Sequence, residues 1–115
     1  MLVDDERHFI EEMEEILKEE PPFKILAKFF NGISALKVVE DLNPDVLITD
    51  VLMPGMSGLE LAKKIRIIKP DLLIILMSDN PSYAVNGYDI GVSGFLLKPL
   101  VKDKVHETLN RLLCG

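Results

Sequence analysis

The stretch Leu72-Leu73-Ile74-Ile75-Leu76-Met77, followed by Ser78-Asp79-Asn80, decides the fold of this chain. Its six consecutive apolar residues form the longest such run in the sequence, and Pro70-Asp71 precedes it. An unbroken run of this length predicts a strand that is buried on both faces, because a half-exposed strand would alternate apolar with polar residues. Strands of this kind are typical of parallel sheets covered by helices. The stretch therefore predicts an α/β fold.

Strand-like and helix-like patterns alternate along the rest of the chain. Further strands are predicted at residues 2–3, 23–30, 46–48 and 94–97. Apolar residues at helical spacing follow each strand, and they indicate helices around residues 9–17, 35–42, 57–68, 81–91 and 101–112. In the first helix, Phe9 falls on the apolar face together with Ile10 and Met13. Five strand-then-helix units predict a five-stranded parallel sheet in one domain that spans residues 1–115.

Length, charge and cysteine content exclude several classes of protein. A chain of 115 residues fits one domain with its own core. A single cysteine excludes an internal disulfide framework, and we expect a reducing, cytoplasmic setting. We expect no membrane span and no secretory signal. The net charge of −6 argues against direct contact with nucleic acid and is compatible with attracting a divalent cation.

Polar residues end four of the five predicted strands. Asp4 and Asp5 follow the first strand, Asp50 the third, Ser78 the fourth and Lys98 the fifth. Each has an ordinary explanation as a helix cap, a turn residue or a solvated lysine. Together they are more informative, because the carboxyl ends of parallel strands share one edge of the sheet, where ligands bind. We therefore expect these side chains to converge in one pocket.

The chemistry of this set suits phosphoryl transfer. Clustered carboxylates repel one another unless a cation lies among them, and oxygen ligands are typical of a Mg²⁺ site. A carboxylate such as Asp50 can also attack phosphorus and form an aspartyl phosphate. Such a transfer depends on neutralising the phosphoryl oxygens, which Mg²⁺, Lys98 and the Ser78 hydroxyl would do.

These residues lie in motifs that resemble the receiver domain of two-component response regulators, over essentially the whole chain. The motifs are Val3-Asp4-Asp5-Glu6, residues 45–58, residues 72–78 and residues 94–99. The resemblance implies a three-layer, flavodoxin-like (βα)₅ fold with strand order 2-1-3-4-5. It also implies a single receiver (phosphoacceptor) domain over residues 1–115, with no output domain present. Such a domain is a signalling module whose chemistry acts on itself, so we expect no enzyme.

The resemblance also implies a role for each acidic residue. Asp50 matches the phosphoacceptor. Asp5 and Asp50 match the metal-binding carboxylates, and the backbone carbonyl of Leu52 matches a third Mg²⁺ ligand. Asp4 matches the second acid, which often acts on the metal through water.

Other positions match the parts that respond to phosphorylation. Ser78 matches the switch hydroxyl, Lys98 the phosphate-pairing lysine and Phe95 the switch aromatic, and the Lys98-Pro99 bond is expected to be cis. Asp79 departs from the family, which usually has a small residue there. Its carboxylate either faces the pocket and modulates phosphorylation, or points outward and helps to start the next helix.

The implied function is a switch controlled by phosphorylation. A sensor histidine kinase or phosphotransfer protein would donate the phosphoryl group with Mg²⁺. The surface formed by residues 81–112 would then change, altering homodimer formation or contacts with an output such as transcription. Residues 82–99 resemble regulators with LytTR-type or AraC-type outputs.

Two alternatives remain open from the sequence. The first is a stand-alone or degenerate receiver that acts by protein contact without phosphorylation. The second is a Mg²⁺ phosphatase with an aspartyl-phosphate intermediate; such enzymes usually carry a second aspartate where this chain has Leu52. A flavin-binding module would need a phosphate cradle after the first strand, where the acidic stretch Asp4-Asp5-Glu6 stands instead.

Overall fold

The structure is a computed structural model that describes residues 1–19 and 23–114. Its strands are β1 (Leu2–Val3), β2 (Lys28–Phe29), β3 (Val46–Asp50), β4 (Leu73–Ser78) and β5 (Gly94–Leu97). Its helices are α1 (Arg7–Glu19), α2 (Gly32–Leu42), α3 (Gly58–Ile68), α4 (Tyr83–Asp89) and α5 (Lys102–Cys114). None of these described helices combines the length and the apolar character needed to cross a bilayer.

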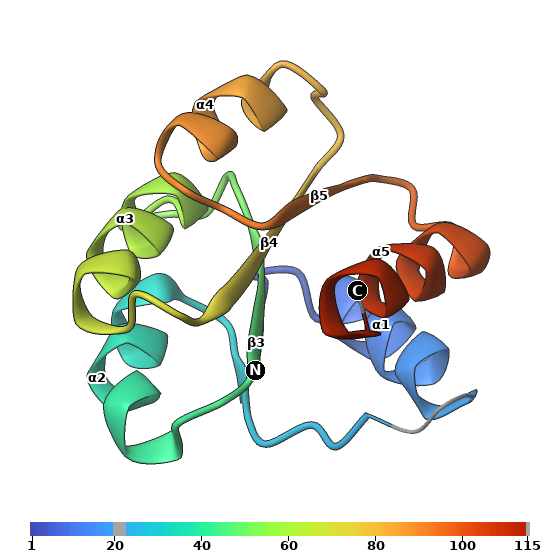
Figure 1. The fold of residues 1–115 in the computed structure, drawn as a ribbon, viewed down its shortest axis with the longest axis horizontal. Helices are drawn as coiled ribbons and strands as arrows, with labels where there is room; N and C mark the ends of the chain where they lie inside the picture. The colour runs from blue at the N-terminus through green and yellow to red at the C-terminus, as the bar shows by residue number, and fades with distance from the viewer. Residues whose placement is uncertain (20–22, 115) are drawn as a thin grey trace.

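All neighbouring strands pair in parallel, in the order β2-β1-β3-β4-β5. Helices α1 and α5 cover one face of the sheet, and α2, α3 and α4 lie on the other side (Figure 1). This is the α/β fold with a five-stranded parallel sheet that the residue patterns predict, and the three-layer, flavodoxin-like arrangement and strand order that the resemblance implies. The order reverses direction at β1 and β3, and such a switch point leaves a crevice at the carboxyl ends of the strands.

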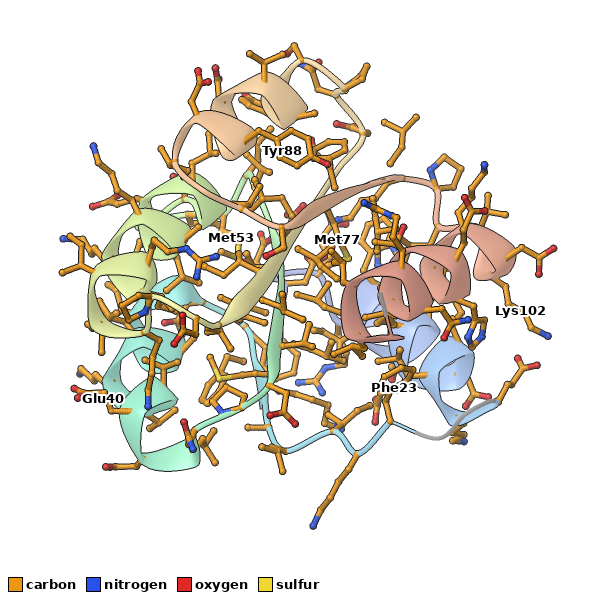
Figure 2. The ribbon with its side chains drawn as sticks, in the orientation of Figure 1. Phe23, Glu40, Met53, Met77, Tyr88 and Lys102 are labelled. Carbon is orange, nitrogen blue, oxygen red and sulfur yellow. The ribbon has the colours of Figure 1, made fainter. Side chains whose placement is uncertain are left out.

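The unbroken apolar run at β4 is explained by two separate apolar clusters. Ile74 and Leu76 are fully buried in the cluster that faces α2 and α3, and Ile75 and Met77 are buried in the cluster that faces α1 and α5. Figure 2 shows Met53 and Met77 on opposite sides of the strands. Burying a side chain of this size contributes about 1.5–3 kcal/mol, so both faces of β4 stabilise the sheet.

Two predicted elements are shorter in the structure. The strand expected over 23–30 is only β2, because β1 has two residues and offers two pairing positions, opposite Lys28 and Phe29. The helix expected over 81–91 is only α4, which follows a turn at Pro81-Ser82.

Gly58 allows α3 to begin directly against the end of β3. A Cβ atom at Gly58 would lie 1.8 Å from the backbone oxygen of Asp50, so any larger residue would push the helix away. The Gly58 amide donates to the Val51 carbonyl over 2.7 Å. One residue earlier, the Ser57 hydroxyl accepts from the Glu60 amide at 3.1 Å and so caps the first turn of α3. These contacts fix the loop that follows Asp50.

Candidate functional site

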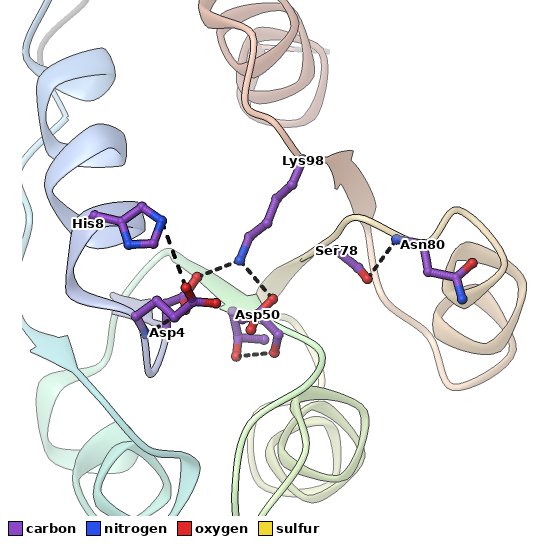
Figure 3. A network of polar contacts seen from close by, with 8 residues as sticks. Asp4, His8, Asp50, Ser78, Asn80 and Lys98 are labelled. Atoms are coloured by element: carbon purple, nitrogen blue, oxygen red, sulfur yellow. Dashed lines mark hydrogen bonds and ion pairs between the residues drawn. The ribbon is translucent and has the colours of Figure 1, made fainter.

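Four buried polar side chains meet at the carboxyl ends of the strands (Figure 3). Asp4 follows β1, Asp50 ends β3, Ser78 ends β4 and Lys98 follows β5. Each of the four is at most 9% exposed. Their convergence follows from the parallel sheet, as their positions at strand ends predict. The peptide bond between Lys98 and Pro99 is cis, which also agrees with the prediction.

Lys98 connects the first and third strands of the chain through its ammonium group. Its Nζ atom donates to Asp4 Oδ2 at 2.9 Å and to Asp50 Oδ1 at 3.0 Å. Burial by itself would lower the pKa of Lys98, but the hydrogen bonds to the two carboxylates outweigh it and raise this pKa above its ordinary value. The lysine is therefore held in its charged form beside the carboxylate of Asp50.

The surroundings disfavour the charged form of Asp50, whereas they favour the charged form of Lys98. Burial raises the pKa of Asp50, the hydrogen bond from Lys98 lowers it, and the nearby Asp4 raises it again, so that the pKa lies above its ordinary value. Asp4 has a second contact, because its Oδ1 accepts from the Glu6 amide at 2.9 Å. Asp4 therefore both caps the chain entering α1 and accepts a hydrogen bond from Lys98 Nζ.

Three carboxylates lie close enough to share a cation. Oxygen atoms of Asp4, Asp5 and Asp50 are all within 4.8 Å of one another, and Asp5 is exposed. Three negative charges stand against the single positive charge of Lys98, which leaves two uncompensated. An all-oxygen donor set with this charge suits a hard divalent cation such as Mg²⁺. Leu52 lines the same pocket.

Ser78 and its neighbours form the other wall of the site. The Ser78 hydroxyl oxygen accepts from the Asn80 amide at 3.1 Å, so it belongs to a turn as well as to the pocket. It uses a lone pair for this contact, and its own proton stays available for another acceptor. Asp79 is exposed and lines the pocket, while Asn80 rather than Asp79 accepts from the Ser82 amide.

Phe95 lies apart from these residues. It is half-buried on β5, paired in register with Leu76, and packs on the apolar cluster that faces α2 and α3. Phe95 is not one of the described residues that line the pocket.

The pocket itself has a volume of about 410 Å³. It is lined by Glu6, His8, Phe9, Asp50, Leu52, Ser78, Asp79, Lys98 and Pro99. Glu6, His8 and Phe9 were not predicted to line this pocket, and helical periodicity predicts that Phe9 lies in the core. A signal was present, since Glu6 directly precedes α1 and His8 and Phe9 lie in its first turn, all close behind Asp4-Asp5 at the end of β1.

A second cavity, of about 310 Å³, lies at the opposite end of the strands. Its walls are mostly apolar, with side chains such as Leu17, Ile25 and Leu109. Of the described residues that line it, one carries a carboxylate, Asp45, so the acidic cluster belongs to the pocket at Asp50.

Known proteins similar to this chain belong to one family. The family model for the response regulator receiver domain matches residues 1–110. The chain is 33% identical to the sensory transduction protein LytT of Oceanobacillus iheyensis, over 97% of this chain and 46% of the relative. It is also 33% identical to the transcriptional regulatory protein DegU of Brevibacillus brevis, over 100% of this chain and 50% of the relative. The chain thus spans about half the length of these curated relatives.

Solved structures show the same fold. The signal receiver domain of NarL from Mycobacterium tuberculosis has a TM-score of 0.88 at 26% identity, covering 99% of this chain and 94% of that one. The isolated REC domain of RcsB from Salmonella enterica, solved in the presence of the phosphomimetic BeF₃⁻, has a TM-score of 0.90 at 25% identity, covering 99% and 86%. With the family model, the relatives and the acidic pocket in agreement, this chain belongs to the response regulator receiver domain family.

Proposed function

We propose that this domain accepts a phosphoryl group on Asp50 from a histidine kinase or a phosphotransfer protein. The observation that carries the proposal is the placement of the Asp50 carboxylate, which is buried beside the Lys98 ammonium at 3.0 Å and clustered with Asp4 and Asp5. A turn residue or a simple ion pair does not explain this arrangement, because the three carboxylates of Asp4, Asp5 and Asp50 share a single ammonium group, that of Lys98.

The transfer needs little chemistry from the protein itself. A carboxylate oxygen of Asp50 attacks phosphorus as the bond between phosphorus and the donor's nitrogen breaks, and the electron pair stays on the donor imidazole. Lys98 is placed to move from Asp50 Oδ1 to a phosphoryl oxygen, and the Ser78 hydroxyl can donate its proton to another. Because the product is the modified domain, this is a signalling function rather than turnover of a substrate.

A magnesium ion fits the acidic cluster. Asp5 and Asp50 would hold it directly with the backbone carbonyl of Leu52, and Asp4 would act through water. When bound, the ion neutralises charge on the phosphoryl group. The residues of the chain orient the acceptor carboxylate and keep the cluster partly closed to water.

The output of the switch lies in contacts with other proteins. The two curated relatives are named a sensory transduction protein and a transcriptional regulatory protein, and both are about twice as long as this chain. We propose that phosphorylation changes the surface of α4, β5 and α5, which would alter homodimer formation or contacts with an output that controls transcription. This domain itself would not contact nucleic acid.

Intact-protein mass spectrometry after incubation with acetyl phosphate tests the proposal. We expect one added phosphoryl group, dependent on Mg²⁺, in the wild type and none in Asp50→Asn. Asp45→Asn is the matched control, because Asp45 is an exposed aspartate just before the other end of β3. It should be labelled like the wild type.

Two results would contradict the proposal. Labelling of Asp50→Asn would place the acceptor elsewhere. An unlabelled wild type, under conditions that label another receiver domain and with a histidine kinase also supplied, would favour a domain that works by protein contact alone.

A further inference from the structure

The ring of Phe9 covers one side of the Lys98 ammonium. The Nζ atom lies 3.6 Å from the ring centroid. This is well inside the distance of about 6 Å at which a cation over an aromatic face is attracted by the ring. The lysine side chain is only 8% exposed, so water screens the contact weakly.

Core packing does not account for the position of this ring. Phe9 is half-buried, and within the part of the chain that the structure describes it is not among the side chains packed on either apolar cluster. The buried residues of α1 are Ile10, Met13, Ile16 and Leu17. Phe9 instead lines the pocket at Asp50, although helical periodicity places it on the apolar face.

The Phe9 ring contacts the Lys98 ammonium on the side that the two carboxylates leave open, and this ammonium has to move when Asp50 is phosphorylated. An ammonium has three N–H donors, and Asp4 and Asp50 accept two hydrogen bonds from Lys98. An aromatic face attracts the charge without offering a strongly directional acceptor. Lys98 can then exchange the Asp50 oxygen for a phosphoryl oxygen while staying in place against the ring.

We propose that Phe9 is a positioning residue that holds the Lys98 ammonium in reach of the phosphoryl group on Asp50. The kinetic part of this inference rests on the proposed function, and the structural part does not. Phe9 acts through Lys98, so its effect depends on the electrons of the ring rather than on its volume.

Three replacements of Phe9 separate electronic from structural effects. Phe9→Leu keeps an apolar side chain and removes the ring, and Phe9→Tyr restores an aromatic face. Replacing Phe9 by 3,4,5-trifluorophenylalanine keeps the shape of the ring and weakens its negative face. This analogue keeps the test valid even if Phe9→Leu folds poorly. Phe29→Leu is the matched control, because Phe29 is also half-buried but packs on the cluster facing α2 and α3.

The first measurement is the rate constant for phosphorylation of Asp50 by acetyl phosphate at saturating Mg²⁺, with Mg²⁺ affinity determined separately. We expect a fall of about three- to thirtyfold in Phe9→Leu and in the trifluoro variant, the range given by a partly desolvated cation–ring contact. Mg²⁺ affinity should stay close to the wild-type value. Phe9→Tyr and Phe29→Leu should react like the wild type.

The second measurement is hydrogen exchange of the Lys98 ammonium protons by ¹⁵N NMR, which needs no phosphorylation. Exchange should be faster in Phe9→Leu and in the trifluoro variant, and unchanged in Phe29→Leu.

The outcomes separate this inference from the proposed function. Wild-type behaviour of the trifluoro and leucine variants in both measurements would overturn the role of Phe9. A wild type that is never phosphorylated would remove the proposed function, while the exchange data would still decide whether Phe9 holds Lys98.

Discussion

Asp79 and Asp50 lie in the same pocket in opposite environments. Asp50 is 6% exposed and bonded to Lys98, and Asp79 is exposed at the rim beside Ser78. Glu6 is a second exposed acid on the same rim. An anionic donor that approaches Asp50 therefore passes negative side chains, and like charges slow such an approach in a way that salt screens.

We predict that Asp79→Asn and Asp79→Ala are phosphorylated faster than the wild type by acetyl phosphate. At low ionic strength the second-order rate constant should rise roughly two- to fivefold, the effect expected of one partly screened charge near the site. The difference should shrink at high salt.

The control for this experiment is Asp71→Asn, since Asp71 is an exposed aspartate just before β4, away from the pocket. It should leave the rate constant unchanged. Equal rates for wild type and both Asp79 variants at low salt would mean that the Asp79 carboxylate does not influence the approach of the donor.

At the scale of the elements, Arg66 joins the end of α3 to the loop before β5. Its Nη1 atom donates to the carbonyl oxygens of Pro70 at 2.8 Å and Leu72 at 2.6 Å, and its Nη2 atom donates to Gly91 at 2.8 Å. Gly91 has a positive φ of 91°, so the loop turns sharply where the guanidinium holds it. Arg66 therefore satisfies carbonyl groups that the end of α3 and the two loops leave unpaired.

We predict that Arg66→Lys lowers the free energy of unfolding by about 1–3 kcal/mol, because lysine carries no planar fork to reach both loops. Urea denaturation followed by circular dichroism measures this. Lys63→Ala, an exposed position on the same helix, should change stability by less than about 0.5 kcal/mol. An Arg66→Lys variant as stable as the wild type would show that the loops are held by their own packing.

The elements differ in how well the sequence predicts them. β4 was predictable because its apolar run indicates burial on both faces, and α3 because its apolar residues recur at helical spacing. β2 was not, since residues 23–30 have strand-like composition but the length of the strand is set by the two residues of its partner β1. Pairing between strands is a property of the sheet, which local composition does not contain.

The residues of the site also differ in how well the sequence predicts their positions. Asp4, Asp50, Ser78 and Lys98 were predictable because topology brings strand ends to one edge. Phe9 was not assigned to the pocket, because periodicity identifies the apolar face of a helix but does not say whether a residue at its first turn meets the core or the edge of the sheet. The contacts of Arg66 depend on two loops far apart in sequence, and no local pattern predicts them.

At the scale of the whole molecule, the site is connected to a surface on α4, β5 and the start of α5. Ser78 pairs in register with Leu97, and Lys98 directly follows. Exposed apolar side chains lie along this region, namely Val85, Tyr88, Leu97 and Val101. A movement of Ser78 and Lys98 toward a phosphoryl group would act on the ends of the two paired strands that carry this surface.

Phe95 connects β4 with α4, because it is paired in register with Leu76 and shares an apolar cluster with Tyr83 and Ile90 at the two ends of α4. We predict that Phe95→Ala still binds beryllofluoride at Asp50 but no longer transmits the change to α4. Hydrogen exchange by mass spectrometry should show altered protection over residues 83–97 when the wild type binds beryllofluoride, and a much smaller change in Phe95→Ala. Phe29→Ala removes another half-buried ring from the same cluster and so controls for lost packing. It should change protection over residues 83–97 as the wild type does. If Phe95→Ala binds beryllofluoride and changes protection over residues 83–97 as fully as the wild type, the coupling runs through Ser78 and Lys98 along the strands without the ring.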